Sequence, residues 1–352
     1  MKKEYNLENY NFDLPKNLIA QKPASPPDTC RLMVLNRKNQ KIIDDKFLNL
    51  PTYLKSGDVL VFNDSKVLPA RLIGKKETGG KVEILLLKSV SQNSWQCLVG
   101  NLKITKQVGT RLKFSKKLNG QIIRREKDTA IIKFNLSDAK LMKQILKIGQ
   151  MPTPPYIKRI AKQNEYQTFF AKKLGSAAAP TAGLHFTPKI FKKLSAKGGS
   201  ASGGKQMGVQ IEFITLHVGL GTFQPVKTQN ITKYQIHEEY FELNTKTAQR
   251  LNQAKKENRR IIAVGTTSIR VLETCAQQNM LKAKKGFTKI YIYPGYKFKF
   301  VNALITNFHV PKSSLILLVS AFAGKKFIDK AYKRAIQKKY RFFSFGDVML
   351  IQ

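Results

Sequence analysis

The chain has 352 residues, of which 63 are lysine or arginine and 22 are aspartate or glutamate, so its formal net charge is +41. A hydrophobic fraction of 42% is sufficient for a folded core and excludes a disordered basic tail. Such a charge indicates a polyanionic partner, with nucleic acid the first candidate, although a lysine-rich proteome would produce the same excess.

The cysteines and the apolar runs bear on compartment and metal content. Cys30, Cys97 and Cys275 are far apart and form no Cys-x-x-Cys pair, which argues against a cysteine zinc site. Their odd number, with no apolar signal-like segment at the N-terminus, predicts a cytoplasmic protein. The most apolar run, residues 315–323, is about half the ~20 residues of a membrane helix. We expect a buried strand or helix segment there, and no membrane span.

The first half of the chain is rich in strand-like segments. Residues 31–37 and 59–64 are predicted strands, and Asn63-Asp64-Ser65 is a predicted turn. Asn119-Gly120 is a hairpin signal, and Ser137 is a candidate N-cap for a helix over 138–148. Between these lie short β-like runs at close spacing, over residues 82–90, 94–100, 111–114, 121–126 and 130–136. This stretch therefore predicts a small all-β, barrel-like unit.

The second half alternates between strands and helices. Thr187-Pro188 begins a predicted helix that ends near Gly198. Further strands are predicted over 211–220, 238–243, 260–267, 289–294 and 303–308, and further helices over 245–258, 268–279 and 325–340. This order favours an α/β domain with a mostly parallel sheet or barrel. We expect the α/β domain to comprise residues 1–60 and 150–352, with a β-barrel-like domain inserted at 61–149.

Four histidines, His185, His217, His237 and His309, lie at predicted ends of strands or helices beside polar residues. His185 ends the small-residue run GSAAAPTAGLHFT, residues 175–187, which has little side chain to pack. A single histidine in such a place is more often structural, but all four together favour a shared site. No pair has the spacing of two ligands on one helix, so we predict no metal.

Four further motifs bear on ligand binding. Gly219-Leu-Gly221 lacks the third glycine and following helix of a dinucleotide fingerprint, which argues against a nicotinamide cofactor. Residues 264–270, VGTTSIR, form either an anion-holding helix start or an ordinary capped turn. Polar residues 307–314 between two apolar runs need partners, which a ligand could supply. Residues 340–347, YRFFSFGD, either stack on unpaired bases or anchor the C-terminus in the core.

Together these segments resemble one family, the S-adenosylmethionine:tRNA ribosyltransferase-isomerases of queuosine biosynthesis. The resemblance runs nearly end to end and is carried by LIAQ (18–21), RLMVL (31–35), GDVLVFNDSKVLPAR (57–71), PPYI (154–157), YQT (166–168), GSAAAPTAGLHFT, TLHVGLGTFQPV (215–226), VGTTSIR, ITNFHVPKSS (305–314), VSAFAG (319–324) and YRFFSFGD. The Gly/Ser-rich insertion near residues 198–208 departs from the family pattern but touches none of these motifs.

The resemblance implies a larger α/β barrel-like domain with a small inserted β-barrel. It also implies transfer and isomerisation of the ribosyl group of S-adenosylmethionine onto 7-aminomethyl-7-deazaguanine (preQ1) at the wobble position of tRNA. The products are epoxyqueuosine, adenine and methionine. S-adenosylmethionine is a consumed co-substrate, so no cofactor is expected. The expected partners are preQ1-bearing tRNA and S-adenosylmethionine, and the expected state is a monomer.

The same resemblance suggests roles for individual residues. His185 or His217 would be the acid or base, and Glu238 or Glu239 would assist it or hold the sulfonium end. Thr266, Thr267 and Arg270 would bind the methionine carboxylate or a phosphate. Asn307, His309 and Lys312 would bind the base or the ribose. The remaining expected contacts are Thr181, Gly219, Gly221, Thr222 and Ser313 to substrate, and Arg71, Tyr340 and Arg341 to tRNA.

Two other classes remain open from the residues alone. A non-catalytic RNA-binding protein would suit the charge and the β-unit but not the four histidines in polar loops. A different S-adenosylmethionine or nucleotide enzyme with a small-molecule substrate would work without tRNA. Binding of S-adenosylmethionine separates the first from the enzyme, and dependence on tRNA separates the second.

Overall fold

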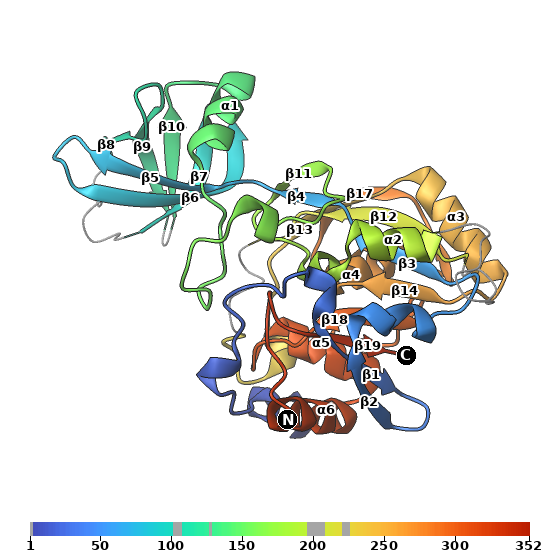
Figure 1. Cartoon of the computed structure of the whole chain (residues 1–352). Coiled ribbons are helices and arrows are strands. Elements are labelled where there is room, and N and C mark those ends of the chain that lie inside the picture. Colours follow the sequence, from blue (N-terminus) through green and yellow to red (C-terminus); the bar gives the residue numbers. More distant parts are fainter. Residues whose placement is uncertain (1–2, 101–107, 127–128, 196–207, 220–225) are drawn as a thin grey trace. The chain divides into compact units, whose positions relative to one another are not determined.

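The computed structural model describes the whole chain except residues 1–2, 101–107, 127–128, 196–207 and 220–225 (Figure 1). The chain forms two compact units. The larger unit comprises Met1–Lys66, Pro155–Lys158 and Asn164–Gln352, and the smaller comprises Val67–Pro154 and Arg159–Gln163. The smaller unit thus begins at Val67 rather than at residue 61. The reason is that strand β4 (Ser65–Val67) pairs with β11 (Lys173–Ser176), a strand of the larger unit.

The smaller unit is a closed six-stranded barrel in the order β10-β7-β6-β5-β8-β9, accompanied by helix α1 (Asp138–Ile148). Every described pairing in it is antiparallel, as the recurring short strands predicted. Asn119-Gly120 is not the hairpin turn. It opens β9, and a Cβ on Gly120 would lie 2.8 Å from Ile132, so glycine is needed there for packing. The barrel strands are β5 (Arg71–Lys76), β6 (Lys81–Ser91), β7 (Ser94–Val99), β8 (Arg111–Lys113), β9 (Asn119–Glu126) and β10 (Thr129–Phe134).

The larger unit is built on a nine-stranded sheet in the order β17-β13-β12-β3-β14-β18-β19-β1-β2. Its central strands β12, β3, β14 and β18 are mutually parallel, and β1 is parallel to β19. The other four pairings are antiparallel, so the sheet is mixed rather than mostly parallel. The strands are β1 (Arg31–Asn36), β2 (Lys41–Lys46), β3 (Val59–Asn63), β12 (Gln210–Leu216), β13 (Glu239–Leu243), β14 (Ile261–Val264), β17 (Lys284–Thr288), β18 (Ala303–Asn307) and β19 (Val348–Ile351).

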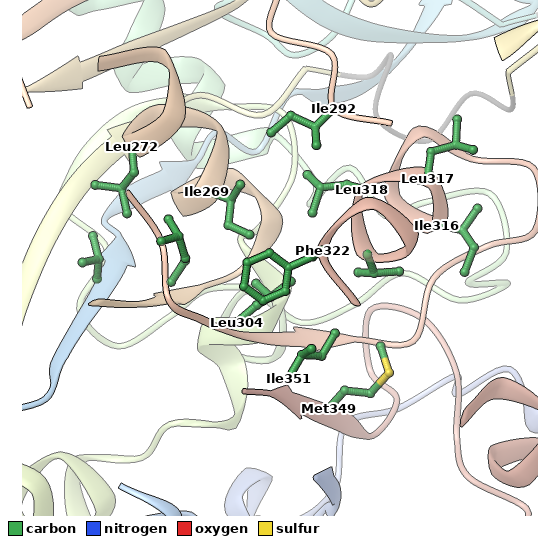
Figure 2. Packing of buried hydrophobic residues seen from close by; sticks show 14 of the residues in the cluster. Ile269, Leu272, Ile292, Leu304, Ile316, Leu317, Leu318, Phe322, Met349 and Ile351 are labelled. Carbon is green, nitrogen blue, oxygen red and sulfur yellow. The ribbon is translucent and has the colours of Figure 1, made fainter. Parts of the chain in front are cut away.

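Hydrophobic clusters cover both faces of this sheet. In β3, Val59 and Val61 join the cluster packed by α3, α4, α5 and α6, whereas Leu60 and Phe62 join the cluster that includes α2. Burial on both faces explains why the central strands are continuous apolar runs. Figure 2 shows the first cluster between α4, α5, β18 and β19. The helices are α2 (Pro188–Ser195), α3 (Thr245–Lys256), α4 (Thr266–Cys275), α5 (Ser314–Ala323) and α6 (Lys325–Gln337).

The predicted fold class, α/β with an inserted small β-barrel, is confirmed; the closed barrel is the smaller unit. The strand predicted over 289–294 is wrong. That segment is irregular, and the edge strand β17 ends just before it. Because Ile292 packs into the core, the segment has the apolar alternation of a strand without forming one. The apolar run 315–323 lies in the ten-residue helix α5. Among the described residues, no helix has both the length and the apolar composition to cross a bilayer.

Candidate functional site

One pocket of the larger unit lies at the carboxyl ends of the parallel strands β14 and β18, beside the start of helix α4. Open parallel sheets bind ligands at this edge, because the loops that leave the strands meet there. Segments far apart in the sequence form the wall. The lining residues are Tyr156, Ala179–Ala182, Val218, Gly265–Thr267, Thr306–Val310, Ser313, Leu315, Phe343 and Ser344.

The start of helix α4 supplies backbone N–H groups and two hydroxyls to this pocket. Gly265 has φ +89°, a conformation that favours glycine, and it joins the end of β14 directly to α4. Thr266 and Thr267 follow and line the pocket. The Thr267 hydroxyl is buried and has no hydrogen-bond partner among the described residues. A helix start with an unpaired hydroxyl suits an anionic or oxygen-rich ligand group.

One turn further along α4, Arg270 forms a buried ion pair with Glu239 of β13. Their side chains are 7% and 4% exposed, and Glu239 also accepts the Gly219 N–H at 2.7 Å. Burial lowers the pKa of Arg270 to about 10, which leaves it charged at neutral pH. Its Nε and Nη2 have no partner within the described part of the chain. Buried donors of a cation are costly unless paired, so this arginine has unused capacity for an anion.

Asn307, at the end of β18, connects three segments of the pocket wall. Its Oδ1 accepts the Thr181 hydroxyl at 3.1 Å, and its Nδ2 donates to the Phe343 carbonyl at 3.1 Å. The same Nδ2 lies 3.0 Å from Nε2 of His185. Asn307 is buried, so each of these bonds is shielded from water. Its amide therefore fixes the relative positions of the 181, 307 and 343 segments.

His185 reaches the pocket wall through Asn307. Its ring is 4% exposed, Nε2 faces the Asn307 amide, and Nδ1 lies 3.2 Å from Cys30 Sγ. Burial first, and then the Arg341 charge, lowers the pKa of His185 to about 3. Since Nδ2 of Asn307 is a donor, Nε2 accepts and the proton is on Nδ1. The structure thus gives His185 the contacts of a neutral residue that positions Asn307, and its catalytic role stays a prediction.

Among the described residues that line the pocket, His309 is the only histidine. Its Nε2 pairs with the Thr306 hydroxyl at 2.9 Å, and Nδ1 has no partner among the described residues. Its backbone N–H donates to the Tyr332 hydroxyl at 2.9 Å, which fixes the loop after β18. Burial lowers the pKa of His309 to about 3, so the ring is neutral and able to accept a hydrogen bond.

His217 lies beside the small-residue segment rather than in the pocket lining. Gly175 has φ +145°, and a Cβ there would lie 2.9 Å from Nε2 of His217, so only glycine allows this contact. Ser176 then donates its hydroxyl to the Ala178 carbonyl and accepts the Val218 N–H at 2.9 Å. The segment therefore runs from the His217 ring to the pocket wall at residues 179–182.

Comparisons with known proteins agree with this arrangement. A family model described as "Queuosine biosynthesis protein" matches residues 7–351. A Thermoanaerobacter protein named S-adenosylmethionine:tRNA ribosyltransferase-isomerase is 49% identical over 351 residues, which cover 97% of this chain and 98% of that one. A Carboxydothermus hydrogenoformans protein of the same name is 48% identical, with 98% and 99% covered.

A solved structure, that of the S-adenosylmethionine tRNA ribosyltransferase of Thermotoga maritima, matches with a TM-score of 0.56 and 37% identity. The match covers 98% of this chain and 100% of that one. This chain belongs to the queuosine biosynthesis protein family. The recognition made from the motifs is thereby confirmed.

Several residues that were expected to bind substrate make contacts within the protein instead. Lys312 pairs with Glu8 at 2.8 Å, and Ser313 caps α5 by accepting the Ile316 N–H. Glu238 is exposed and lies 3.7 Å from Lys289. Gly219 donates to Glu239, as given above. Gly221 and Thr222 lie outside the described residues.

The expected tRNA contacts divide into two groups. Arg71, in the barrel unit, pairs with Glu83 at 2.8 Å, and Arg341 pairs with Asp347 at 3.1 Å. Both arginines are part-exposed, so neither pairing excludes RNA contact. Tyr340 is fully buried, and its hydroxyl donates to Asp44 at 2.8 Å. A ring enclosed in the core has no free face for a base, so the stacking role of Tyr340 is wrong and the core-anchor alternative holds.

Three lining residues of family motifs had no role assigned from the sequence. Tyr156 and Ser344 form a hydroxyl pair of 2.7 Å on the pocket wall, and the Phe343 ring lies 4.7 Å from the Tyr156 ring. Phe343 has φ +71°, a rare conformation for a bulky residue. Its aromatic neighbours in the sequence point into the core, so the pattern alone did not separate it from them.

Proposed function

We propose that this chain is an S-adenosylmethionine:tRNA ribosyltransferase-isomerase that forms epoxyqueuosine from preQ1 at the tRNA wobble position. The observation that carries the proposal is the convergence of six family motifs on one pocket. Residues 156, 179–182, 218, 265–267, 306–310 and 343–344 come from these six motifs and share that wall. The proteins that match nearly end to end bear the name of this activity.

S-adenosylmethionine has an anionic end that fits the start of α4. Its carboxylate would accept from the helix N–H groups and the unpaired Thr267 hydroxyl. Arg270 lies one turn further along α4, is not among the described lining residues, and would supply positive charge from there. Its adenosyl group would occupy the small-residue wall, where Ala179, Pro180 and Ala182 leave space for a ring. The Asn307 amide holds that wall in place.

The reaction needs a proton acceptor close to the ribose C5′, which the neighbouring sulfonium acidifies. His309 lines the pocket and has Nδ1 available, so its position makes it the candidate proton acceptor. His185 acts through Asn307 as a positioning residue. The attacking amine of preQ1 must be neutral, and the wobble base must leave its stack to reach the site.

The decisive assay is adenine release from S-adenosylmethionine, measured with and without preQ1-bearing tRNA. Release only with tRNA supports the proposal. Release without tRNA would favour a small-molecule enzyme, and absence of S-adenosylmethionine binding would favour a non-catalytic RNA-binding protein. A cytoplasmic location and a monomeric state complete the proposal, and fractionation and sedimentation test them.

Two matched pairs of variants locate the chemistry within the larger unit. His309→Gln should lower turnover at saturating substrate by about 10²-fold or more, the usual contribution of a general base. The control His237→Gln, at an exposed histidine, should not. Thr267→Val should weaken S-adenosylmethionine binding, whereas Thr274→Val, on the same helix with its hydroxyl paired to Thr288 at 2.7 Å, should leave binding unchanged. Equal effects within either pair would contradict these roles.

A further inference from the structure

Three adjacent strands of the barrel unit place lysines directly opposite one another. Lys75 of β5 is the register partner of Lys81 on β6 and of Lys113 on β8 (Figure 1). All three are exposed, whereas Val82 and Leu112, their neighbours along β6 and β8, are buried in the barrel core. Adjacent strands are about 4.8 Å apart, so these three residues, the lysine row, span about 10 Å of the outer surface.

A second row of exposed polar side chains lies two residues further along the strands. In it, Gln121 of β9 is the register partner of both Arg111 on β8 and Lys133 on β10. Arg111, Lys113 and Lys133 line one groove of the barrel surface. Among the described residues that line this groove, Glu77 is the only acidic one. The two rows together thus form a basic surface.

The charges of the lysine row are not compensated within the part of the chain that the structure describes. The two acidic residues of the β5–β6 hairpin pair with other cations, Glu77 with Arg111 at 3.5 Å and Glu83 with Arg71 at 2.8 Å. The whole smaller unit has 20 lysines and arginines but only 5 acidic residues in its sequence. Like charges directly opposite on neighbouring strands are destabilising, and a bound anion would offset that cost.

Two ordinary reasons for exposed lysines do not account for the lysine row. Lysines on a strand often block pairing with another chain, but a closed barrel has no free edge to protect. A general lysine excess raises the charge of the whole surface. It does not favour positions that face one another across three adjacent strands, where repulsion is strongest.

The residue types of this surface indicate the chemistry of its partner. Neither row contains an aromatic side chain, so the surface cannot stack on bases and is suited to contacts with a phosphate backbone. The Gln121 amide is a further donor that phosphate oxygens accept. Three cations spread over about 10 Å favour a polyanion with repeated charges over a single phosphate group.

We propose that the lysine row, with Arg111 and Lys133 beside it, binds the phosphate backbone of a tRNA stem. This inference rests on the proposed function, because tRNA is the polyanion that the reaction requires. The surface contributes to affinity and to the KM for tRNA. It does not contribute to the chemical step, since its residues are not among those that line the pocket of the larger unit.

The test compares two double variants of the full chain that lose the same charge. Lys75→Gln/Lys113→Gln changes the lysine row, and Lys143→Gln/Lys147→Gln removes two exposed lysines of α1 in the same unit. Affinity for tRNA is measured by filter binding between about 50 and 200 mM salt. The slope of log affinity against log salt should become shallower by about two in the row variant, one for each lost phosphate contact, and binding at 0.1 M salt should be about 10- to 100-fold weaker.

The control readouts separate binding from folding and from catalysis. The α1 variant should keep the wild-type slope. The melting temperature of the row variant should not fall, because the substitutions remove a repulsion between opposed lysines. Its KM for tRNA should rise, while kcat at saturating tRNA stays at the wild-type value.

Several results would overturn the proposed surface. One is an unchanged salt slope in the row variant, and another is an equal change of slope in the α1 variant, which would assign the effect to net charge alone. A third is saturable binding of inorganic tripolyphosphate that requires the lysine row while the tRNA slope is unchanged, which would assign the surface to a free polyanion. If the wild type binds tRNA but releases no adenine, the proposed function fails, and the salt slopes still decide whether the lysine row binds RNA.

Discussion

Variants of the buried ion pair Arg270–Glu239 should change the free energy of unfolding and the affinity for S-adenosylmethionine to different degrees. Arg270→Met removes the ion-pair partner of the buried Glu239 carboxylate. Removing one partner of a buried ion pair costs about 3–5 kcal/mol, because the other charge stays in a low dielectric. We therefore expect a large fall in the free energy of unfolding, measured by urea titration of the larger unit's transition.

The double variant Glu239→Gln/Arg270→Met removes both charges and should recover most of that stability. It should not recover ligand binding, because the unpaired Nε and Nη2 of Arg270 are proposed to supply positive charge for the methionine carboxylate. A hydrogen bond to a charged group is worth about 1.5–3 kcal/mol, which corresponds to about 10- to 150-fold weaker S-adenosylmethionine binding. Calorimetric titration measures the Kd. A stable double variant with wild-type affinity would show that Arg270 serves only its ion pair, and would refute the reasoning.

Three other predictions follow from the same structure. Burial lowers the pKa values of His185 and His309 to about 3 in the folded protein. As the pH falls from about 6.5 to about 3, these two rings therefore become protonated only in the unfolded chain. Stability should therefore be full above pH 6.5 and fall by about 1.4 kcal/mol per pH unit for each ring, and a His185→Gln/His309→Gln variant with the same slope would contradict this. Gly175→Ala should displace the His217 ring and lower stability, because both the φ of +145° and the 2.9 Å approach oppose a Cβ; an unchanged melting temperature would contradict it. Affinity for tRNA should fall steeply between 50 and 200 mM salt, roughly 10³-fold or more if the basic surface makes six or more phosphate contacts, and a flat profile would assign the +41 charge to proteome bias.

The sequence predicted the fold best where its patterns were local. Short β-like runs separated by turn residues predicted the barrel strands, and the Ser137 N-cap predicted helix α1. Continuous runs of apolar residues predicted the central strands of the large sheet. The strand predicted over 289–294 failed because the alternation there comes from a loop with Ile292 packed inward. β19 was missed, since its four residues are identified by pairing with β1 and β18 rather than by any local signal.

Motifs located the site, but they could not rank its residues. The sequence predicted that His185, His217 and His309 share one site. Among the described residues, the structure brings only His309 of the three into the pocket lining. Whether a ring faces a cavity or supports a neighbour depends on long-range contacts such as Asn307 to His185.

The most direct test of the central claim is an experimental structure of the protein with S-adenosylmethionine. The account predicts the carboxylate at the start of α4, within hydrogen-bond distance of Thr267 and with Arg270 close by. It also predicts the ribose beside His309 and the adenine against residues 179–182. Ligand density anywhere else, or a carboxylate that contacts neither Thr267 nor Arg270, would contradict it.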